Sequence, residues 1–246
     1  MSSKNYLSIY AKSFNWAGFF LPKKTYKNCS YLYDFCRVVD NIADDEDEIK
    51  IKKIKFQKFV SDFKQKNFKD PVIQNMWNII YEFNISLEII YDLFDGIESD
   101  IKQNIKIDTR KDLLIYCYRV AGTVGLMMAK ILKVSKKQSL KSAIDLGIAM
   151  QLTNISRDVI EDSKKNRSYI NGNFEEINST IKLADTFYKN SFYSIREIPL
   201  SFRFSILVAR RIYRKIGYKI LKKKTFKNYS KSGKIYVSNL EKVLET

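Results

Sequence analysis

The chain has 246 residues, a length typical of one domain of ordinary size. Its 8 Gly and 3 Pro form a far smaller share of the sequence than the roughly 12% that average usage gives the two together. So few turn-forming residues, with 45% hydrophobic residues, argue against a β-sandwich, a barrel or a disordered chain. We expect an all-α fold, a single helical domain over residues 1–246 with short loops.

The formal net charge is +17 and the chain contains no histidine. A positive field of this size attracts nucleic acid, anionic lipid or phosphorylated substrates, and a general composition bias toward Lys is the alternative explanation. No recognisable nucleic-acid motif occurs, so we expect no nucleic-acid partner. Because histidine is absent, carboxylates, Tyr, Lys or phosphate must supply any acid–base or metal chemistry.

The three cysteines, Cys29, Cys36 and Cys117, lack the CxxC spacing of a zinc or redox site. An odd number of thiols without such spacing predicts a reducing, cytoplasmic location. The N-terminus is polar and has no signal-peptide core. The apolar run at 120–129 is shorter than the roughly 18 to 20 residues that span a bilayer. Peripheral contact with an anionic membrane is compatible with the charge.

In the N-terminal half, the first long helix should begin near Lys23, directly after Pro22, and reach the acidic run at 44–48. A Lys-rich amphipathic helix is expected over 49–63. Further helices should open at residue 71 and near residue 86, and the second of these should end or bend near residue 96.

In the C-terminal half, Asp108 or Thr109 can cap a helix that ends near residue 132. A second long helix follows closely, over 136–165. Two more helices are expected at 176–196 and 200–222, and the remaining tail should fold back as a loop and a short helix.

Asp40 and Asp44 form the first candidate site, at the end of the first long helix. Residues four apart lie on one helical face, about 6 Å apart, and two carboxylates there repel each other unless a cation lies between them. The alternative is a helix end that runs into the solvated acidic segment DDEDE.

A second acidic face carries Asn154, Asp158 and Asp162, spaced four residues apart on the long helix. Oxygen ligands of this kind, with substrate phosphates, are the usual shell of Mg²⁺. A charged outer face is the alternative, although apolar residues on several sides of this helix favour burial. Facing one another across a cavity, the two acidic faces would grip a diphosphate through Mg²⁺. Arg37, Arg157 and Arg167 would neutralise other phosphate oxygens or, alternatively, pair within their own helices.

Small residues recur at Ala121, Gly125 and Ala129, with Gly122 beside them. Glycine inside a helix costs about 1 kcal/mol relative to Ala, so something must compensate for it. Close helix packing and room for a long apolar ligand are both consistent with this stripe.

Three blocks of the sequence resemble the squalene/phytoene synthase family, the head-to-head prenyl diphosphate synthases. The first is SFNWAGFFLPKKTYKNCSYLYDFCRVVDNIAD at 13–44, and the second is YCYRVAGTVGLMMAKIL at 116–132. The third is LGIAMQLTNISRDVIEDSKKNRSYI at 146–170, and VARRIYRKIG at 208–217 is a weaker match. The resemblance covers most of the chain and implies an isoprenoid synthase helical bundle with a central apolar cavity.

The resemblance also implies roles for individual residues. The metal-binding positions would be Asp40, Asp44, Asn154, Asp158 and Asp162, with Mg²⁺ as the ion and Mn²⁺ as an alternative. The positions that bind substrate would be Lys12, Ser13, Tyr33, Arg37, Gln151, Arg157, Arg167 and Tyr213, with Tyr169 closing the last block. The cavity would be lined by Phe14, Tyr116, Val120, Ala121, Gly122 and Gly125.

Four departures from the family pattern stand out, and one is that the chain is shorter than typical members, with the deficit between Gly172 and Pro199. Asn41 replaces the second of the paired aspartates that often open the first motif, and Asn171 replaces a Pro that usually closes the last block. A phosphate-binding Arg near the C-terminus of some members is replaced by Lys231 or Lys234. None of these changes removes a metal-binding position.

The implied activity is the Mg²⁺-dependent condensation of two geranylgeranyl diphosphates, through prephytoene diphosphate, to phytoene in carotenoid biosynthesis. The alternative within the family is a squalene or dehydrosqualene synthase that uses two farnesyl diphosphates. Two further alternatives are a non-catalytic assembly factor of this fold and a basic membrane-binding helical module. Nothing in the sequence predicts an oligomeric state.

Overall fold

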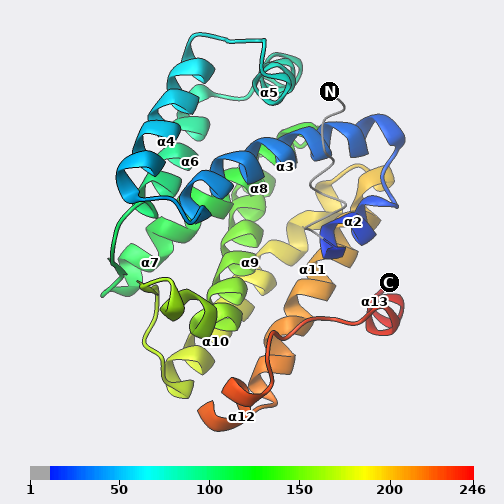
Figure 1. Ribbon diagram of the computed structural model, residues 1–246. Helices are drawn as coiled ribbons and strands as arrows, with labels where there is room; N and C mark the ends of the chain where they lie inside the picture. The colour runs from blue at the N-terminus through cyan, green and yellow to red at the C-terminus, as the bar shows by residue number, and fades with distance from the viewer. Residues whose placement is uncertain (1–11) are drawn as a thin grey trace.

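The computed structural model describes residues 12–246, and the side chains of these residues from Phe14 onward. Helices cross and pack around one another in several layers (Figure 1), and the short parallel strand pair β1–β2 is the sheet in the described part of the chain. The all-α prediction is confirmed. The elements are α2 (Lys12–Gly18), α3 (Lys23–Asp44), α4 (Ile49–Lys64), α5 (Pro71–Phe83), α6 (Leu87–Ser99), β1 (Ile105–Lys106), α7 (Arg110–Cys117), the π-helix η1 (Tyr118–Gly122), α8 (Thr123–Ile131), α9 (Lys137–Lys164), β2 (Arg167–Ser168), α10 (Phe174–Phe192), the 3-10 helix η2 (Tyr193–Glu197), α11 (Leu200–Leu221), α12 (Phe226–Lys231) and α13 (Asn239–Glu245).

Local sequence signals determine where the helices begin. Pro71 occupies the first turn of α5, and the Asp70 carboxylate accepts a hydrogen bond from Val72 N at 2.8 Å. Of the two predicted caps for the helix after residue 108, Thr109 is the one used. Its hydroxyl accepts a hydrogen bond from Asp112 N at 3.1 Å.

As predicted, α6 ends near Gly96, at Ser99, although Gly96 itself lies inside the last turn of the helix. A Cβ atom at this position would lie 2.8 Å from Cβ of Arg119 and from Cγ1 of Val120. The glycine is therefore needed for the close approach of α6 to η1, and not for a helix end.

Residues 110–131 form one continuous helix through α7, η1 and α8, longer than the apolar run seen in the sequence. By length and composition this helix is long enough to cross a membrane. In the bundle, η1 and α8 contact α6 and α9, and 39% of the apolar stretch of this helix is buried (Figure 1). Its apolar residues thus supply part of the core and part of the cavity wall.

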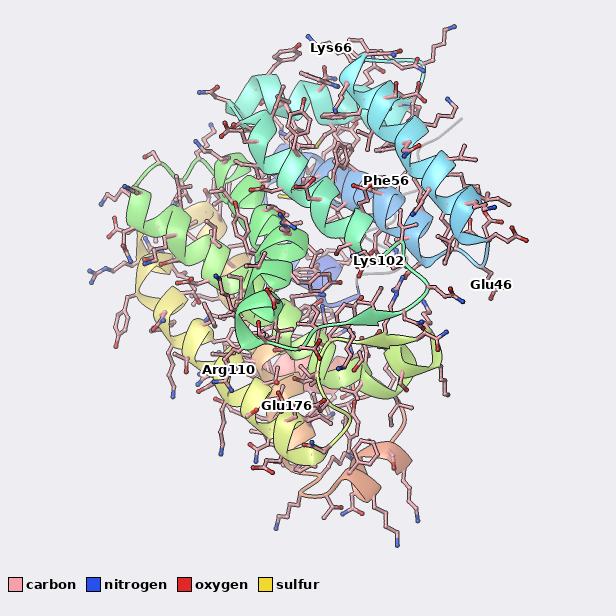
Figure 2. All side chains as sticks on the ribbon, turned by 90° about the vertical axis from the view of Figure 1, so that its left-hand side faces the viewer. Glu46, Phe56, Lys66, Lys102, Arg110 and Glu176 are labelled. Carbon is pink, nitrogen blue, oxygen red and sulfur yellow. The ribbon has the colours of Figure 1, made fainter. Side chains whose placement is uncertain are left out.

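The hydrophobic core has two parts that meet along α8 and α9. The first lies among α3 to α6 and α8, and contains Leu32, Phe35 and Phe63. The second lies among α9, α10 and α11, and contains Leu152 and Ile212. Figure 2 shows Phe56 directed inward from α4, whereas Lys66 and Glu46 lie at the periphery.

The C-terminal tail forms two short helices where one was predicted. Ser238 and Glu241 form a capping box at the start of α13, and the Lys219 ammonium on α11 donates to the Glu241 carboxylate at 2.7 Å. The Trp16 indole on α2 donates to the Thr246 hydroxyl at 3.0 Å. The tail therefore binds back onto α2 and α11.

Candidate active site

A cavity of about 370 Å³ lies between α3, α8 and α9, and residues from α2, α10, η2 and α11 complete its wall. Along α9 its lining extends from Asn154 to Ser139. A helix rises about 1.5 Å per residue, so this lining spans about 22 Å. The cavity is thus a long channel parallel to α9.

The two ends of this channel differ in chemistry. One end carries Arg37 and Asp40 from α3, Asp100, and Gln151 and Asn154 from α9. The other end is largely apolar and is lined by Leu21, Leu132, Val134, Ile195 and Ile198, with small Ser side chains between them. This arrangement accommodates a molecule with an anionic head and a long hydrocarbon tail.

Most of the predicted cavity residues take their expected places, and Gly122 does not. Phe14, Tyr116, Val120, Ala121 and Gly125 all line the cavity. Gly122 is buried on another side of the helix, where an added Cβ would lie 3.1 Å from the Ile144 and Tyr118 side chains. Residues 120, 121, 124, 125, 128 and 129 line the cavity as one helical stripe, and residue 122 lies off this stripe.

The small-residue stripe serves both functions that the sequence left open. Ala121, Gly125 and Ala129 line the cavity. A Cβ atom on Gly125 would also overlap the Ala143 carbonyl of α9, and one on Gly147 would overlap the Ala121 carbonyl. Close packing of α8 on α9 and room for a ligand therefore depend on the same residues.

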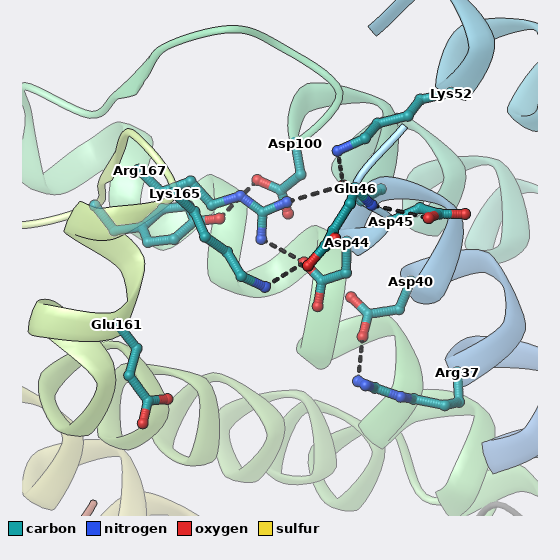
Figure 3. A network of polar contacts seen from close by, with 12 residues as sticks. Arg37, Asp40, Asp44, Asp45, Glu46, Lys52, Asp100, Glu161, Lys165 and Arg167 are labelled. Atoms are coloured by element: carbon teal, nitrogen blue, oxygen red, sulfur yellow. Dashed lines mark hydrogen bonds and ion pairs between the residues drawn. The ribbon is translucent and has the colours of Figure 1, made fainter. Parts of the chain in front are cut away.

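On the first acidic face, two carboxylates at the end of α3 contact different cations (Figure 3). The Asp40 carboxylate accepts from Arg37 Nη1 at 2.6 Å, and the Asp44 carboxylate accepts from Arg167 Nη1 at 2.6 Å. Burial and the nearby charge of Asp44 raise the pKa of Asp40 to about 6. Burial alone would raise the pKa of Asp44, but the charge and hydrogen bond of Arg167 hold it below its ordinary value.

The adjoining acidic segment behaves as the solvated alternative predicted. Asp45 and Glu46 lie past the end of α3, and the Asp45 carboxylate forms an ion pair with Lys55 at 3.1 Å. The helix thus ends between Asp44, which faces the site, and Asp45, which faces solvent.

On the second acidic face, Asp158 accepts from Arg157 Nε at 2.8 Å and lies 3.4 Å from the Lys234 ammonium. Lys234 is one of the two lysines that could replace the phosphate-binding Arg of some family members. Its ammonium thus lies at this second acidic face. Burial and the charge of Asp158 raise the pKa of Asp162 to about 7. Asn154 Oδ1 is buried and has no hydrogen-bond partner among the described residues.

Asp100 is the site residue that sequence reasoning missed. It is buried at the end of α6, where its carboxylate accepts from the Tyr116 hydroxyl at 2.7 Å and the Tyr169 hydroxyl at 2.8 Å. The two tyrosine rings stack with their centroids 4.7 Å apart. Burial raises the pKa of Asp100, and its charge in turn raises the pKa values of Asp40 and Asp162. The sequence signal that could have identified Asp100 is its position between two apolar residues, Ile97 and Ile101. Both of these residues are buried in the structure.

The residues that the family resemblance assigned to substrate occupy two positions. Tyr33, Arg37, Gln151 and Tyr213 line the cavity, and Tyr213 packs against Phe14 with ring centroids 4.9 Å apart. Arg157 and Arg167 lie outside the cavity lining and hold Asp158 and Asp44. The side chains of Lys12 and Ser13 lie outside the described residues.

The donor set fits Mg²⁺, although its members do not yet surround a common point. Among the described residues, no three carboxylates or thiols lie close enough to hold one ion together. Three of the carboxylates, those of Asp40, Asp44 and Asp158, instead contact an Arg or Lys. Of the candidate ligands, Asp40 and Asn154 line the cavity, whereas Asp44, Asp158 and Asp162 lie outside its lining. The orphaned oxygen of Asn154 and the Asp40 carboxylate are ligands of the kind that a hard cation prefers.

A helical bundle with an acidic end and a long apolar channel defines an enzyme of the isoprenoid synthase fold. Residues 7–172 match the sequence profile of the squalene/phytoene synthase family, and the chain belongs to that family. The predicted resemblance is confirmed. As a member, the protein is a prenyltransferase whose substrates are prenyl diphosphates.

Two curated relatives and one solved structure are similar to this chain over most of its length. A phytoene synthase from Pseudescherichia vulneris is 28% identical over 243 residues, covering 85% of this chain and 78% of the relative. A 4,4'-diapophytoene synthase from Staphylococcus haemolyticus is 31% identical over 201 residues, covering 73% and 67%. The crystal structure of a dehydrosqualene synthase superposes with a TM-score of 0.78 at 26% identity, covering 99% of this chain and 92% of that one.

Proposed function

We propose that this enzyme is a 15-cis-phytoene synthase, which joins two geranylgeranyl diphosphates head to head. The observation that carries the proposal is the channel, which spans about 22 Å along α9 and joins an acidic end to an apolar end. Similarity to phytoene synthases over most of the chain supports the longer substrate. The free thiols, with Cys29 and Cys117 buried, favour the cytoplasm.

The proposed cofactor is Mg²⁺, with Asp40 and Asp44 on one face and Asn154, Asp158 and Asp162 on the other as its ligands. Bound Mg²⁺ would neutralise the negative charge that develops on a leaving diphosphate. For this to happen the carboxylates must exchange their present partners. Arg37, Arg157 and Arg167 would then be released toward phosphate oxygens, which they can bind in a bidentate manner.

The remaining residues of the site would position the substrate and exclude water. Loss of the first diphosphate leaves an allylic cation, and attack by the double bond of the second substrate with loss of one proton gives a cyclopropylcarbinyl diphosphate. A second ionisation releases the second diphosphate, and a rearrangement and loss of a second proton then yield the hydrocarbon. The apolar wall keeps water from quenching the cations, and the faces of Phe14, Tyr33 and Tyr116 stabilise positive charge. With no histidine in the chain, the released diphosphate is the proposed proton acceptor.

The alternative within the family is condensation of two farnesyl diphosphates. The similarity to a 4,4'-diapophytoene synthase and to a dehydrosqualene synthase favours this alternative. Both reactions use the same acidic end, and they differ in the length of hydrocarbon that the apolar end accepts.

Incubation of the purified protein with each prenyl diphosphate and Mg²⁺, with and without NADPH, distinguishes these reactions. We expect phytoene from geranylgeranyl diphosphate without a reductant. If farnesyl diphosphate gave a product and geranylgeranyl diphosphate gave none, the phytoene assignment would be wrong. Asp44→Asn should abolish turnover, whereas the adjacent Asp45→Asn, in the solvent-facing segment, should leave it unchanged.

A further inference from the structure

Exposed aromatic and aliphatic side chains gather where the end of α2 meets the start of α11. Phe19, Phe20, Leu200 and Phe204 are all exposed, and we call them the α2–α11 apolar patch. The rings of Phe20 and Phe204 meet edge to face with their centroids 4.8 Å apart, so the two segments form one surface. A contiguous apolar surface of this kind usually marks an interaction site.

The patch lies directly outside the apolar end of the channel. Leu21, next to Phe20, lines the cavity, and so does Ile198, two residues before Leu200. Beyond Phe204, Ile206 also lines it. One turn of chain at each segment thus separates the channel wall from the surface.

The surroundings of the patch are positively charged. Residues 19–24 and 196–204 contain Lys23, Lys24, Arg196 and Arg203, and Glu197 is the single carboxylate within them, while Lys24 is paired with Glu82 at 2.9 Å. Glu197 contacts both Lys136 and Arg196, so its charge is already compensated. The Arg203 guanidinium donates to the Ile198 carbonyl at 3.1 Å and holds the loop before α11.

We propose that the α2–α11 apolar patch docks on an anionic phospholipid bilayer, and that the hydrocarbon product leaves the channel there. Apolar side chains enter the boundary of the acyl chains, while the flanking cations contact lipid phosphates. The exit of product rests on the proposed function, whereas the docking itself does not.

The Lys-rich helix α4 is the rival surface, since it also carries exposed apolar residues, Ile51 and Ile54. Among the described residues, however, none from α4 lines the channel. Docking through α4 would therefore not bring a bilayer to the apolar end of the channel. Substitutions at Ile51 and Ile54 thus serve as the matched control for substitutions in the α2–α11 apolar patch.

Co-sedimentation without substrate tests the docking. The probe is a vesicle of phosphatidylcholine and phosphatidylglycerol, compared with one of phosphatidylcholine alone. Phe19 is 76% exposed and Leu200 is 77% exposed, so Phe19→Ser/Leu200→Ser should leave the fold intact. We expect it to lower the partition coefficient on anionic vesicles about tenfold or more. Ile51→Ser/Ile54→Ser should bind as wild type, and equal binding by both variants, or loss in the α4 variant alone, would overturn the proposal.

A label at the patch tests the same surface directly. An environment-sensitive dye on Phe19→Cys should shift its emission to the blue on anionic vesicles, and the same dye on Ile54→Cys should not. If Phe19→Ser/Leu200→Ser changes the mass of the protein in solution from an oligomer to a monomer, with unchanged vesicle binding, the patch is an interface between copies and the proposal is wrong.

Turnover separates docking from the proposed reaction. In detergent micelles the patch variant should form product at the wild-type rate, because neither residue lines the channel. On anionic vesicles it should release product several-fold more slowly. Absence of product in the wild-type protein would refute the proposed function while leaving the vesicle result to decide the docking. If the variant and the wild type released product from vesicles at equal rates, the proposal that product leaves the channel at the patch would be wrong.

Discussion

Arg167 and Asp44 are 123 residues apart in the chain, yet Arg167 Nη1 lies 2.6 Å from Asp44 Oδ1. The same guanidinium donates from Nη2 to the Ala43 carbonyl at 3.1 Å. Arg167 thereby joins the end of α3 to strand β2, which follows α9 (Figure 3). This one side chain links the two sequence blocks that carry the candidate metal ligands.

A double-mutant cycle should show that Arg167 and Asp44 are coupled. Arg167→Met leaves the partly buried Asp44 carboxylate with only the Lys165 ammonium, 3.6 Å away, so we expect a loss in the free energy of unfolding that is smaller than the roughly 3–5 kcal/mol of a fully buried pair. Arg167→Met/Asp44→Asn should lose less than the sum of the single changes, by about 0.5–3 kcal/mol. Urea unfolding measures each value, and strict additivity would show that the contact contributes no net stability.

Mg²⁺ and inorganic pyrophosphate should bind together. Because the carboxylates already contact cations, Mg²⁺ alone should raise the melting temperature little, whereas both ligands together satisfy the acids and the arginines. At a concentration 100 times the dissociation constant, linkage predicts about 2.7 kcal/mol of stabilisation. Thermal unfolding with either ligand and with both measures this. Asp158→Asn should remove the joint effect, and a joint shift equal to the sum of the separate shifts would contradict it.

Gly147→Ala should disturb the packing of α9 on η1. The added methyl would overlap the Ala121 carbonyl, which belongs to the backbone and cannot rotate away. We expect a loss of about 1–3 kcal/mol. Gly172→Ala is the control, because nothing lies within 4 Å of a Cβ atom there. Chemical denaturation compares the two, and equal stability of both variants would show that α9 can move away from η1 without loss of stability.

The docking of α13 should weaken in acid. The hydrogen bonds from Lys219 and from Ser238 N lower the pKa of Glu241 to about 2, below its ordinary value of 4.5. A lowered pKa means that the contribution to stability is complete above pH 4.5 and is lost as the pH falls toward 2. The hydrogen-exchange protection factors of the α13 amides, which are corrected for the intrinsic exchange rate at each pH, should fall over that range. Glu241→Gln keeps a side-chain oxygen that can accept from Ser238 N but loses the charge that pairs with Lys219, so its α13 amides should be less protected already at pH 7 and change little further in acid.

The sequence by itself determined the helices and the chemical groups that they carry. Helix starts follow from Pro71 and Thr109, and the acidic faces follow from residues four apart, because both depend on neighbours within one or two turns. The tertiary structure alone decided which groups from distant segments meet. It placed Asp100 beside Tyr116 and Tyr169 and brought Lys234 to Asp158. Such contacts depend on how whole helices pack against one another, and no local spacing encodes that.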